Sequence, residues 1–318
     1  MTAAPTMVAR VEEYLALRRQ LGFALQSSGQ QLLGFARYAD GASHRGPITV
    51  ELAVRWARLP QGARPFWWAR RLQIVRGFAR YRSLFDRGTE IPPAGLLGPS
   101  SRRATPHIYS ETEIAALLLA AGELGPAGGL RPHTYVTLLG LLITTGLRIS
   151  EALRLGRDDA DLHSGVLTVQ LTKFRKSRLV PLHPSTVLAL AKYARRRDQH
   201  HPHPSARTFF LNEVGAPLGA SGVASTFDAL RGKLGWTKNR EGRRPRLHDM
   251  RHTMAVRTLL RWYREGAEVD RKMPALSTYL GHVEVSDTYW YLTAVPELMA
   301  LTAARFQAYR RRSLGRMR

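Results

Sequence analysis

The sequence has 318 residues, with 48 Lys and Arg against 24 Asp and Glu, a net charge of +24 and a pI near 11.3. This length allows two domains of ordinary size, and the 44% hydrophobic content excludes wholesale disorder. The two-to-one excess of basic residues favours nucleic acid as a partner over a membrane surface. The absence of cysteine excludes disulfides, cysteine nucleophiles and cysteine-bound zinc, and it fits a cytoplasmic, nucleoid-associated protein.

Signals for membranes, cofactors and metals are missing from the sequence. The longest apolar run, 136–143, is far too short to span a bilayer, and no N-terminal stretch has the order of a signal peptide. Neither a GxGxxG nor a GxxxxGK[ST] loop occurs, so we expect no nucleotide cofactor. His200, His201 and His203 lie in a Pro-rich loop with nothing nearby to complete a ligand set, so we expect no metal.

Residues 1–88 are predicted to form a compact helical domain that contacts DNA. Thr49 is placed as the N-cap of one helix, with apolar residues following it. Another helix carries an apolar stripe at spacings of 4, 3 and 4 between Trp68 and Ala79, and its arginines lie mostly off that stripe. A single arginine there most simply faces solvent, but as a set they favour phosphate contacts.

The stretch 89–106 breaks the helical pattern and is predicted to be a basic linker. It concentrates Pro, Gly and Ser residues and then continues with Arg102 and Arg103. Residues 107–318 form the second predicted domain, which ends in an amphipathic helix and an Arg-rich tail. The whole chain is therefore predicted to be mainly α with a small β-sheet.

The second domain opens with Ser110 and Glu113, which form a capping-box pattern in front of a helix. A nearly all-apolar helix at 135–144 follows and delivers Arg148 just after its end. A buried helix that ends in an arginine needs an anionic partner. Glu151 and a bound phosphate are the candidates for that partner.

Short β-like runs at 166–171 and 178–183 predict a hairpin, and 209–211 is a candidate for a further strand. The hairpin turn is basic, although taken alone it would most simply be an ordinary polar turn. A second basic loop, 238–246, leads into His248. Across the chain, the candidate contacts to the DNA backbone are Arg71, Arg76, Arg80, Arg102, Arg103, Arg175, Lys176, Arg243 and Arg244.

Five residues form a set that suits one substrate. His248 and Arg251 stand one helical turn apart, which places an imidazole and a guanidinium on one face. A second imidazole, His282, follows after a break, and Tyr291 comes nine residues later. Together with Arg148 they provide two fixed cations, two imidazoles and a phenol, the groups that a phosphodiester requires.

In their order along the chain these motifs resemble a known family, the tyrosine recombinases of the phage-integrase group, closest in layout to its Xer-like and transposon-associated members. The resemblance covers roughly 110–292, whereas 1–88 matches only in size and helical character. It implies a helical core-binding (SAM-like) domain followed by an α+β catalytic domain. The five signals are Gly146–Leu147–Arg148–Ile149–Ser150–Glu151, the Lys173 turn before Arg178–Leu179–Val180–Pro181–Leu182, His248–x–x–Arg251–His252, Leu280–Gly281–His282 and Tyr291.

The resemblance implies that Tyr291 attacks the scissile phosphate and forms a 3′-phosphotyrosine, leaving a free 5′-hydroxyl. Arg148 and Arg251 would hold the non-bridging oxygens and stabilise the pentavalent transition state. Because the phosphotyrosine keeps the energy of the cut diester, rejoining would need no ATP or other cofactor. Tyr289 lies close by, but the spacing of nine residues after His282 favours Tyr291 as the nucleophile.

The resemblance also implies the proton donors. Lys173 would protonate the leaving 5′-oxygen, His248 would assist proton transfer at the tyrosine, and His282 would donate a hydrogen bond to the phosphate. Phe174 stands where the family usually has a small residue, so Lys176 competes with Lys173 for the role of general acid.

Three functions remain open from the sequence. The first is a site-specific recombinase that binds double-stranded DNA and serves a mobile element, with four identical protomers on two sites. Whether a second recombinase or an accessory protein takes part stays open. The second is a type IB topoisomerase-like enzyme that relaxes DNA alone, and the third is a non-catalytic, architectural DNA-binding protein.

Overall fold

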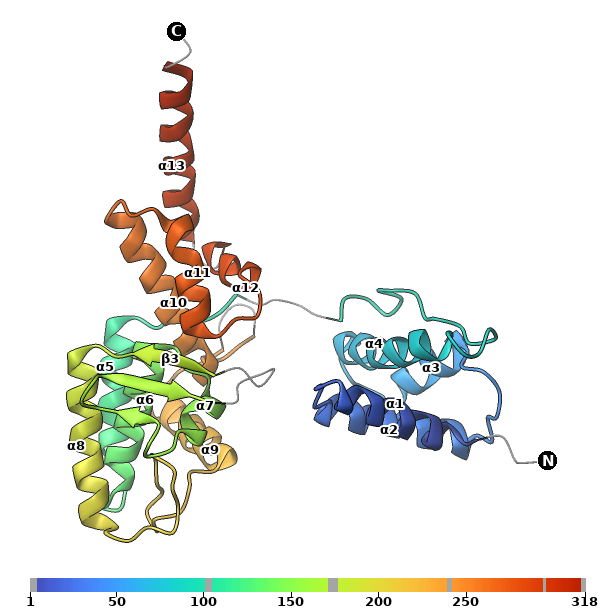
Figure 1. The fold of residues 1–318 in the computed structure, drawn as a ribbon, viewed down its shortest axis with the longest axis horizontal. Helices are drawn as coiled ribbons and strands as arrows, with labels where there is room; N and C mark the ends of the chain where they lie inside the picture. The colour runs from blue at the N-terminus through green and yellow to red at the C-terminus, as the bar shows by residue number, and fades with distance from the viewer. Residues whose placement is uncertain (1–4, 101–104, 171–176, 239–241, 294–295, 316–318) are drawn as a thin grey trace. The chain divides into compact units, whose positions relative to one another are not determined.

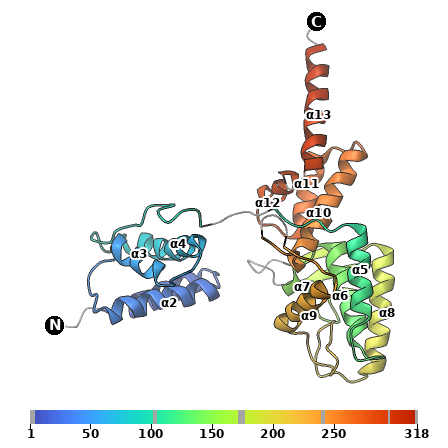
Figure 2. The same cartoon turned by 180° about the vertical axis from the view of Figure 1, so that it is seen from behind.

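The computed structural model describes residues 5–100, 105–170, 177–238, 242–293 and 296–315. The chain divides into two compact units, Met1–Ala104 and Thr105–Arg318. Helices dominate the described part of both units, and the second also contains a sheet of three short strands (Figures 1 and 2). The predicted fold class, mainly α with a small β-sheet, is therefore confirmed.

The first unit is a helical bundle around an aromatic core. Thr49 accepts a hydrogen bond from the amide of Leu52 and so caps α3, as its sequence position predicts. Phe35 and Trp56 meet edge to face with ring centroids 5.5 Å apart, and Phe78 is fully buried beside them. The helices of this unit are α1 (Met7–Gln20), α2 (Gln26–Gly41), α3 (Val50–Arg58) and α4 (Pro65–Arg82).

Residues that follow α4 also pack on this bundle. The amide of Glu90 donates to the carbonyl of Ile48 at 2.8 Å, and its carboxylate accepts from the amide of Val50 at 2.6 Å. The Arg76 guanidinium donates to the carbonyl of Pro92 at 2.8 Å. The segment 89–92, the start of the predicted linker, is thus fixed on the first unit.

The second unit begins at a helix whose predicted capping box is present. The hydroxyl of Ser110 accepts from the amide of Glu113 at 3.1 Å, and the Glu113 carboxylate accepts from the amide of Ser110 at 2.7 Å. The helices of this unit are α5 (Glu111–Gly122), α6 (Arg131–Thr145), α7 (Ile149–Arg154), α8 (Pro184–His200), α9 (Ala220–Lys233), α10 (Leu247–Arg264), α11 (Val269–Leu280), α12 (Ser286–Tyr289), the 3-10 helix η2 (Trp290–Thr293) and α13 (Pro296–Gly315).

The sheet has the order β1 (Ala160–Asp161), β2 (Val166–Val169) and β3 (Arg178–Pro181), with antiparallel neighbours. β2 and β3 therefore confirm the predicted hairpin, whose turn residues 171–176 lie outside the described part of the chain. The inner face, with Leu167, Val169 and Val180, is buried in the main core of the unit.

The predicted strand at 209–211 is wrong. The chain makes only isolated bridges there, between Thr208 and Gly156 and between Leu211 and Pro217. Phe209 and Phe210 are both buried, so the segment lacks the in-and-out alternation of a sheet strand. The amide of Leu211 donates to the hydroxyl of Tyr193, a side chain, and not to a neighbouring strand.

A second, smaller core joins α10, α11, η2 and α13. It includes Leu259, Met273, Leu280, Tyr291 and Leu298, all at most 3% exposed. Among the side chains of α13 whose burial the structure describes, Leu298 in the first turn is the buried contribution to this core. In Figures 1 and 2 the rest of this helix projects away from α10 and α11. Across the described residues, no helix combines the length and the apolar content that crossing a bilayer requires.

Candidate active site

The helices α6 and α11 each end in a glycine, and these two helix ends lie close together. Gly146 terminates α6 with φ +64°, and Gly281 terminates α11 with φ +70°. This left-handed conformation favours glycine. The last carbonyls of any α-helix have no amide partners within the helix itself. These carbonyls carry the negative end of the helix dipole, so they are suited to hold cations.

The two predicted arginines donate hydrogen bonds to carbonyls at these helix ends. Arg251 is 2% exposed, and its guanidinium donates to the carbonyls of Gly146 at 2.8 Å and Leu280 at 2.7 Å. Arg148 donates to the carbonyl of Gly281 at 3.1 Å. Burial lowers the pKa of Arg251 to about 10, so this guanidinium stays charged at neutral pH. Segments far apart in the sequence thus fix two positive charges side by side.

Glu151 balances part of this charge. It is 4% exposed, and it accepts hydrogen bonds from Arg148 and from Arg178, each at 2.8 Å. Burial alone would raise its pKa, but the hydrogen bonds and charge of Arg178, with those of Arg148, lower the pKa to about 2. Glu151 is therefore the anionic partner of Arg148 that the sequence predicted. Arg178 also donates to the carbonyl of Tyr279 at 2.8 Å, a scaffolding role that the sequence did not reveal.

The predicted nucleophile, Tyr291, lies at this pair of arginines. It is 3% exposed on η2, and burial raises the pKa of its hydroxyl, while the charge of Arg251 and a hydrogen bond with it oppose the rise. The ring of His282 stacks on the tyrosine at 5.9 Å with an angle of 23° between the planes. The competing Tyr289 is 41% exposed on the preceding helix.

His282 is held in a defined orientation. Its Nδ1 atom lies 2.7 Å from the hydroxyl of Thr288, which is fully buried. Burial, followed by the charges of Arg251 and Arg148, lowers the pKa of His282 to about 4. A neutral imidazole fixed at Nδ1 presents its other nitrogen, Nε2, to a ligand.

His248 and its neighbour His252 complete the site. His248 is exposed, and desolvation and the charge of Arg251 lower its pKa. The His252 ring meets His248 edge to face at 4.9 Å and also contacts Trp290 and Tyr291, at 5.2 and 5.4 Å. Its Nδ1 atom is buried without a hydrogen-bond partner, and burial lowers its pKa to about 4. Sequence reasoning gave His252 no role, although it follows Arg251 directly.

The structure brings together five of the six predicted catalytic residues: Arg148, His248, Arg251, His282 and Tyr291. The sixth, Lys173, and its competitor Lys176 lie outside the described residues, as do Arg102, Arg103 and Arg175. Where the structure describes the chain, no three acidic or histidine side chains gather closely enough to hold a metal ion.

The remaining candidate DNA contacts differ in their surroundings. Arg71 donates to the carbonyl of Trp56 at 2.9 Å and lies 3.8 Å above the centre of its ring, so it ties α4 to α3. Arg76 is held by a backbone carbonyl in the same unit. Arg80 and Arg244 are exposed, and Arg243 is half-buried.

Comparison with known proteins identifies the family of the chain. Residues 111–297, more than half of the chain, match the phage integrase family. The chain is 46% identical, over 91% of its length and 93% of the relative's, to the protein named integrase/recombinase y4rB of Sinorhizobium fredii. It is 27% identical, over 70% of its length and 65% of the relative's, to the tyrosine recombinase XerC of Chlamydia caviae. The chain belongs to the phage integrase family of tyrosine recombinases, and its enzyme class is site-specific DNA recombinase.

The fold is shared with solved members of this group. The Tn1549 transposon integrase in complex with transposon right end DNA superposes with a TM-score of 0.69 at 16% identity. The match covers 96% of this chain and 99% of that structure. At such low identity the likeness concerns the fold alone.

Proposed function

We propose that the chain cuts and rejoins duplex DNA through a 3′-phosphotyrosine on Tyr291. The observation that carries this proposal is the convergence of Tyr291 with Arg148 and Arg251 around the ends of α6 and α11. The tyrosine oxygen attacks the phosphorus atom, the phosphorus–5′-oxygen bond breaks, and the 5′-oxygen leaves as a hydroxyl after protonation. The two guanidiniums stabilise the charge on the non-bridging oxygens, which is greatest in the transition state.

The proton transfers fall to the basic groups around the tyrosine. His248 is neutral at physiological pH because its pKa is lowered, so it can accept the proton of the attacking hydroxyl. His282 donates to a phosphate oxygen from Nε2. Lys173, or Lys176 in its place, protonates the leaving oxygen. Each transfer contributes roughly 10²–10⁴-fold to the rate.

We assign the first unit to DNA binding and the second to catalysis, with duplex DNA as the substrate. The net charge of +24 supports a DNA partner, and the 46% identical relative that is named integrase/recombinase supports a mobile-element role. Four protomers would assemble on two sites. The exposed part of α13, with Met299 and Phe306 at 55% and 62% exposure, would then dock on a neighbour.

The direct test is a covalent trap. DNA from the flanks of the gene, nicked near the crossover, is mixed with wild-type protein or Tyr291→Phe and denatured in SDS. Wild type is expected to form a protein–DNA adduct that maps to Tyr291, and the variant is expected to form none. Tyr289→Phe is the matched control, because this exposed ring lies outside the proposed site and should leave the adduct intact.

The other possible results of this experiment would contradict either the proposed nucleophile or the proposed function. An adduct that survives in Tyr291→Phe would contradict the proposed nucleophile. No adduct from wild type, despite binding that weakens steeply with salt, would indicate a non-catalytic DNA-binding protein. Relaxation of supercoils by a protein that never joins two sites would indicate a topoisomerase-like enzyme.

A further inference from the structure

His252 lies in the candidate active site, yet the mechanism proposed above gives it no step. Its ring meets the ring of His248 edge to face, with centroids 4.9 Å apart and an angle of 89° between the planes. The same ring contacts Trp290 at 5.2 Å and Tyr291 at 5.4 Å, again edge to face. One side chain of α10 therefore contacts both the proposed base and the proposed nucleophile.

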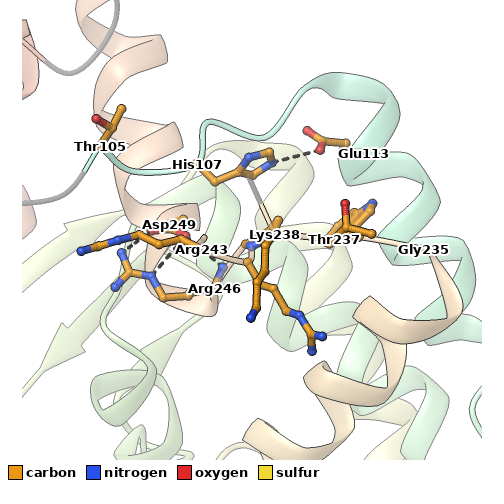
Figure 3. Close-up of a pocket in the computed structure, with 12 residues that line it drawn as sticks. Thr105, His107, Glu113, Gly235, Thr237, Lys238, Arg243, Arg246 and Asp249 are labelled. Carbon is orange, nitrogen blue, oxygen red and sulfur yellow. Dashed lines mark hydrogen bonds and ion pairs between the residues drawn. The ribbon is translucent and has the colours of Figure 1, made fainter. Parts of the chain in front are cut away.

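The backbone at the start of α10 is fixed independently of this ring. Asp249 is 2% exposed, and its carboxylate accepts from the amide of Arg246 at 2.9 Å and from the guanidinium of Arg246 at 2.8 Å. Figure 3 shows this pair at the start of the helix. The hydroxyl of Tyr109 donates to the carbonyl of Arg246 at 3.0 Å. These contacts determine where the helix begins, but none of them involves the side chain of His248.

The orientation of His248 depends on its neighbours along the helix. His248 and His252 are four residues apart on α10, so their side chains lie one turn apart on the same face. The side chain of His248 is exposed, and water alone does not confine it to one rotamer. The ring of His252, in contact with it, limits its rotation on that side.

The imidazole of His252 contributes a shape and not a charge. Its Nδ1 atom is buried without a hydrogen-bond partner among the described residues. Burial, followed by the charge of His248, lowers the pKa of His252 to about 4, so the ring is neutral at physiological pH. A neutral ring of this kind holds its neighbours through van der Waals and edge-to-face contacts.

We propose that His252 is a positioning residue whose ring sets the positions of His248 and Tyr291 relative to each other. The inference rests on the proposed function, in which His248 accepts the proton of the Tyr291 hydroxyl. That transfer needs the two groups within hydrogen-bond reach, roughly 2.6–3.2 Å, or joined by one water. The two residues come from separate elements, α10 and η2, and the ring of His252 is a contact that they share.

The test compares rates of adduct formation by the full chain in single turnovers at saturating nicked DNA. His252→Ala removes the ring, and it is expected to slow adduct formation on the order of 10²-fold, as a displacement of about 1 Å does. Its affinity for the same DNA, measured by fluorescence anisotropy, should stay within about twofold of wild type, because the ring acts on the reacting groups and not on binding. His252→Phe restores a flat ring of similar size, and it should keep the rate within about threefold of wild type.

Val256→Ala is the matched control for lost packing. Val256 is fully buried in the smaller core one turn further along α10, and its truncation removes none of the ring contacts of His252. This variant should lose stability but keep the rate within about threefold of wild type. All variants are assayed where circular dichroism shows them to be folded. If His252→Ala does not fold, His252→Leu replaces it, because it restores volume without a flat ring, and a loss of at least about tenfold is then expected.

Three results would each overturn the proposal: a wild-type rate in the variant without the ring, an equally slow His252→Phe, or an equal loss in Val256→Ala. NMR of the DNA-free protein separates this question from the fate of the proposed function. The edge-to-face contact shifts the ring-proton signals of His248, which are assigned by their loss in His248→Gln. Removal of the ring should move these signals towards those of free histidine, and His252→Phe should keep them shifted; unmoved signals would also overturn the proposal. Wild type without any adduct would contradict the recombinase mechanism, and the spectra would then decide whether His252 positions His248.

Discussion

Single arginines in this chain have roles that their contacts decide. Arg148 and Arg251 hold helix carbonyls with part of each guanidinium and keep further N–H groups for a ligand. The guanidinium of Arg178 donates to Glu151 and to the carbonyl of Tyr279, and its side chain is 8% exposed. Arg178 therefore supports the candidate site and is not presented to a ligand. Arg71 ties two helices together through Trp56. A sequence shows which positions carry a guanidinium, and only folding shows what each one faces.

His252 allows a test of how the site responds to acid. Its pKa is about 4 in the folded chain and near 6.5 in the unfolded chain, so between these values the unfolded state binds more protons. Stability therefore falls as pH drops from 6.5 towards 4. His252→Phe removes this proton and loses no hydrogen bond at the buried Nδ1 atom. Between pH 7 and 5 wild type should lose on the order of 1 kcal/mol more stability than the variant.

Urea unfolding at pH 7 and pH 5 measures that difference. His163→Gln is the control, because it removes an exposed imidazole at the turn between β1 and β2, away from the candidate site. Parallel losses of stability in His252→Phe and wild type would show that the ring is not kept neutral by its surroundings. His282, whose pKa is also lowered to about 4, contributes to the remaining pH dependence of the variant, as do His248 and His133, whose pKa values burial lowers.

The elements that depend on contacts between residues close in the sequence could be predicted from the sequence. The caps at Thr49 and Ser110 each use a side chain three residues from its partner, and the hairpin pairs neighbouring runs. The strand prediction for 209–211 was wrong because the hydrogen-bond partners of this segment are distant in the sequence. The amide of Phe209 donates to the carbonyl of Leu155, and the amide of Leu211 donates to the side chain of Tyr193. The proposed catalytic residues could be predicted only as motifs, since their meeting point depends on where α6 and α11 end.

A substitution at Gly281 tests how tightly Arg178 packs against the end of α11. A Cβ there would lie 2.7 Å from Nη1 of Arg178, which cannot move freely because it is bonded to Glu151 and Tyr279. Gly281→Ala must therefore displace this guanidinium in addition to adopting a left-handed φ of +70°. We expect it to lower the free energy of unfolding by about 2–4 kcal/mol.

Gly266→Ala is the matched control for this change. Gly266 has nearly the same φ, +71°, but nothing lies within 4 Å of its would-be Cβ, so it isolates the backbone term of about 1–2 kcal/mol. Urea denaturation of both variants gives the comparison. Equal losses would show that the packing of Arg178 against Gly281 adds nothing to stability.

At the level of the whole molecule, the second unit has two cores with the site between them. The main core surrounds α6 and the sheet, while the smaller one joins α11, η2 and the first turn of α13. Arg251, on α10, donates to a carbonyl from each region, at Gly146 and Leu280. Tyr291, the proposed nucleophile, belongs to the smaller core, and Arg148, which we propose binds the phosphate, follows the larger one. Whatever α13 binds is therefore connected, through Leu298, to the core that contains Tyr291.

The outer part of α13 tests whether protomers assemble through it. Phe306 is 62% exposed in the single chain, so Phe306→Asp should leave the melting temperature of the unbound protein unchanged within about 2 °C. If the ring docks on a neighbour, burying a carboxylate there would weaken assembly on paired sites by at least about tenfold. Gln307→Asp places the same charge at the next exposed position and should keep assembly within about threefold of wild type.

Native gels of protein with two-site DNA count the protomers, and the SDS adduct on one site reports cleavage. Normal assembly by Phe306→Asp would exclude this face of α13 as the contact, whereas lost assembly with cleavage retained would show that α13 joins protomers whose active sites are each complete within one chain.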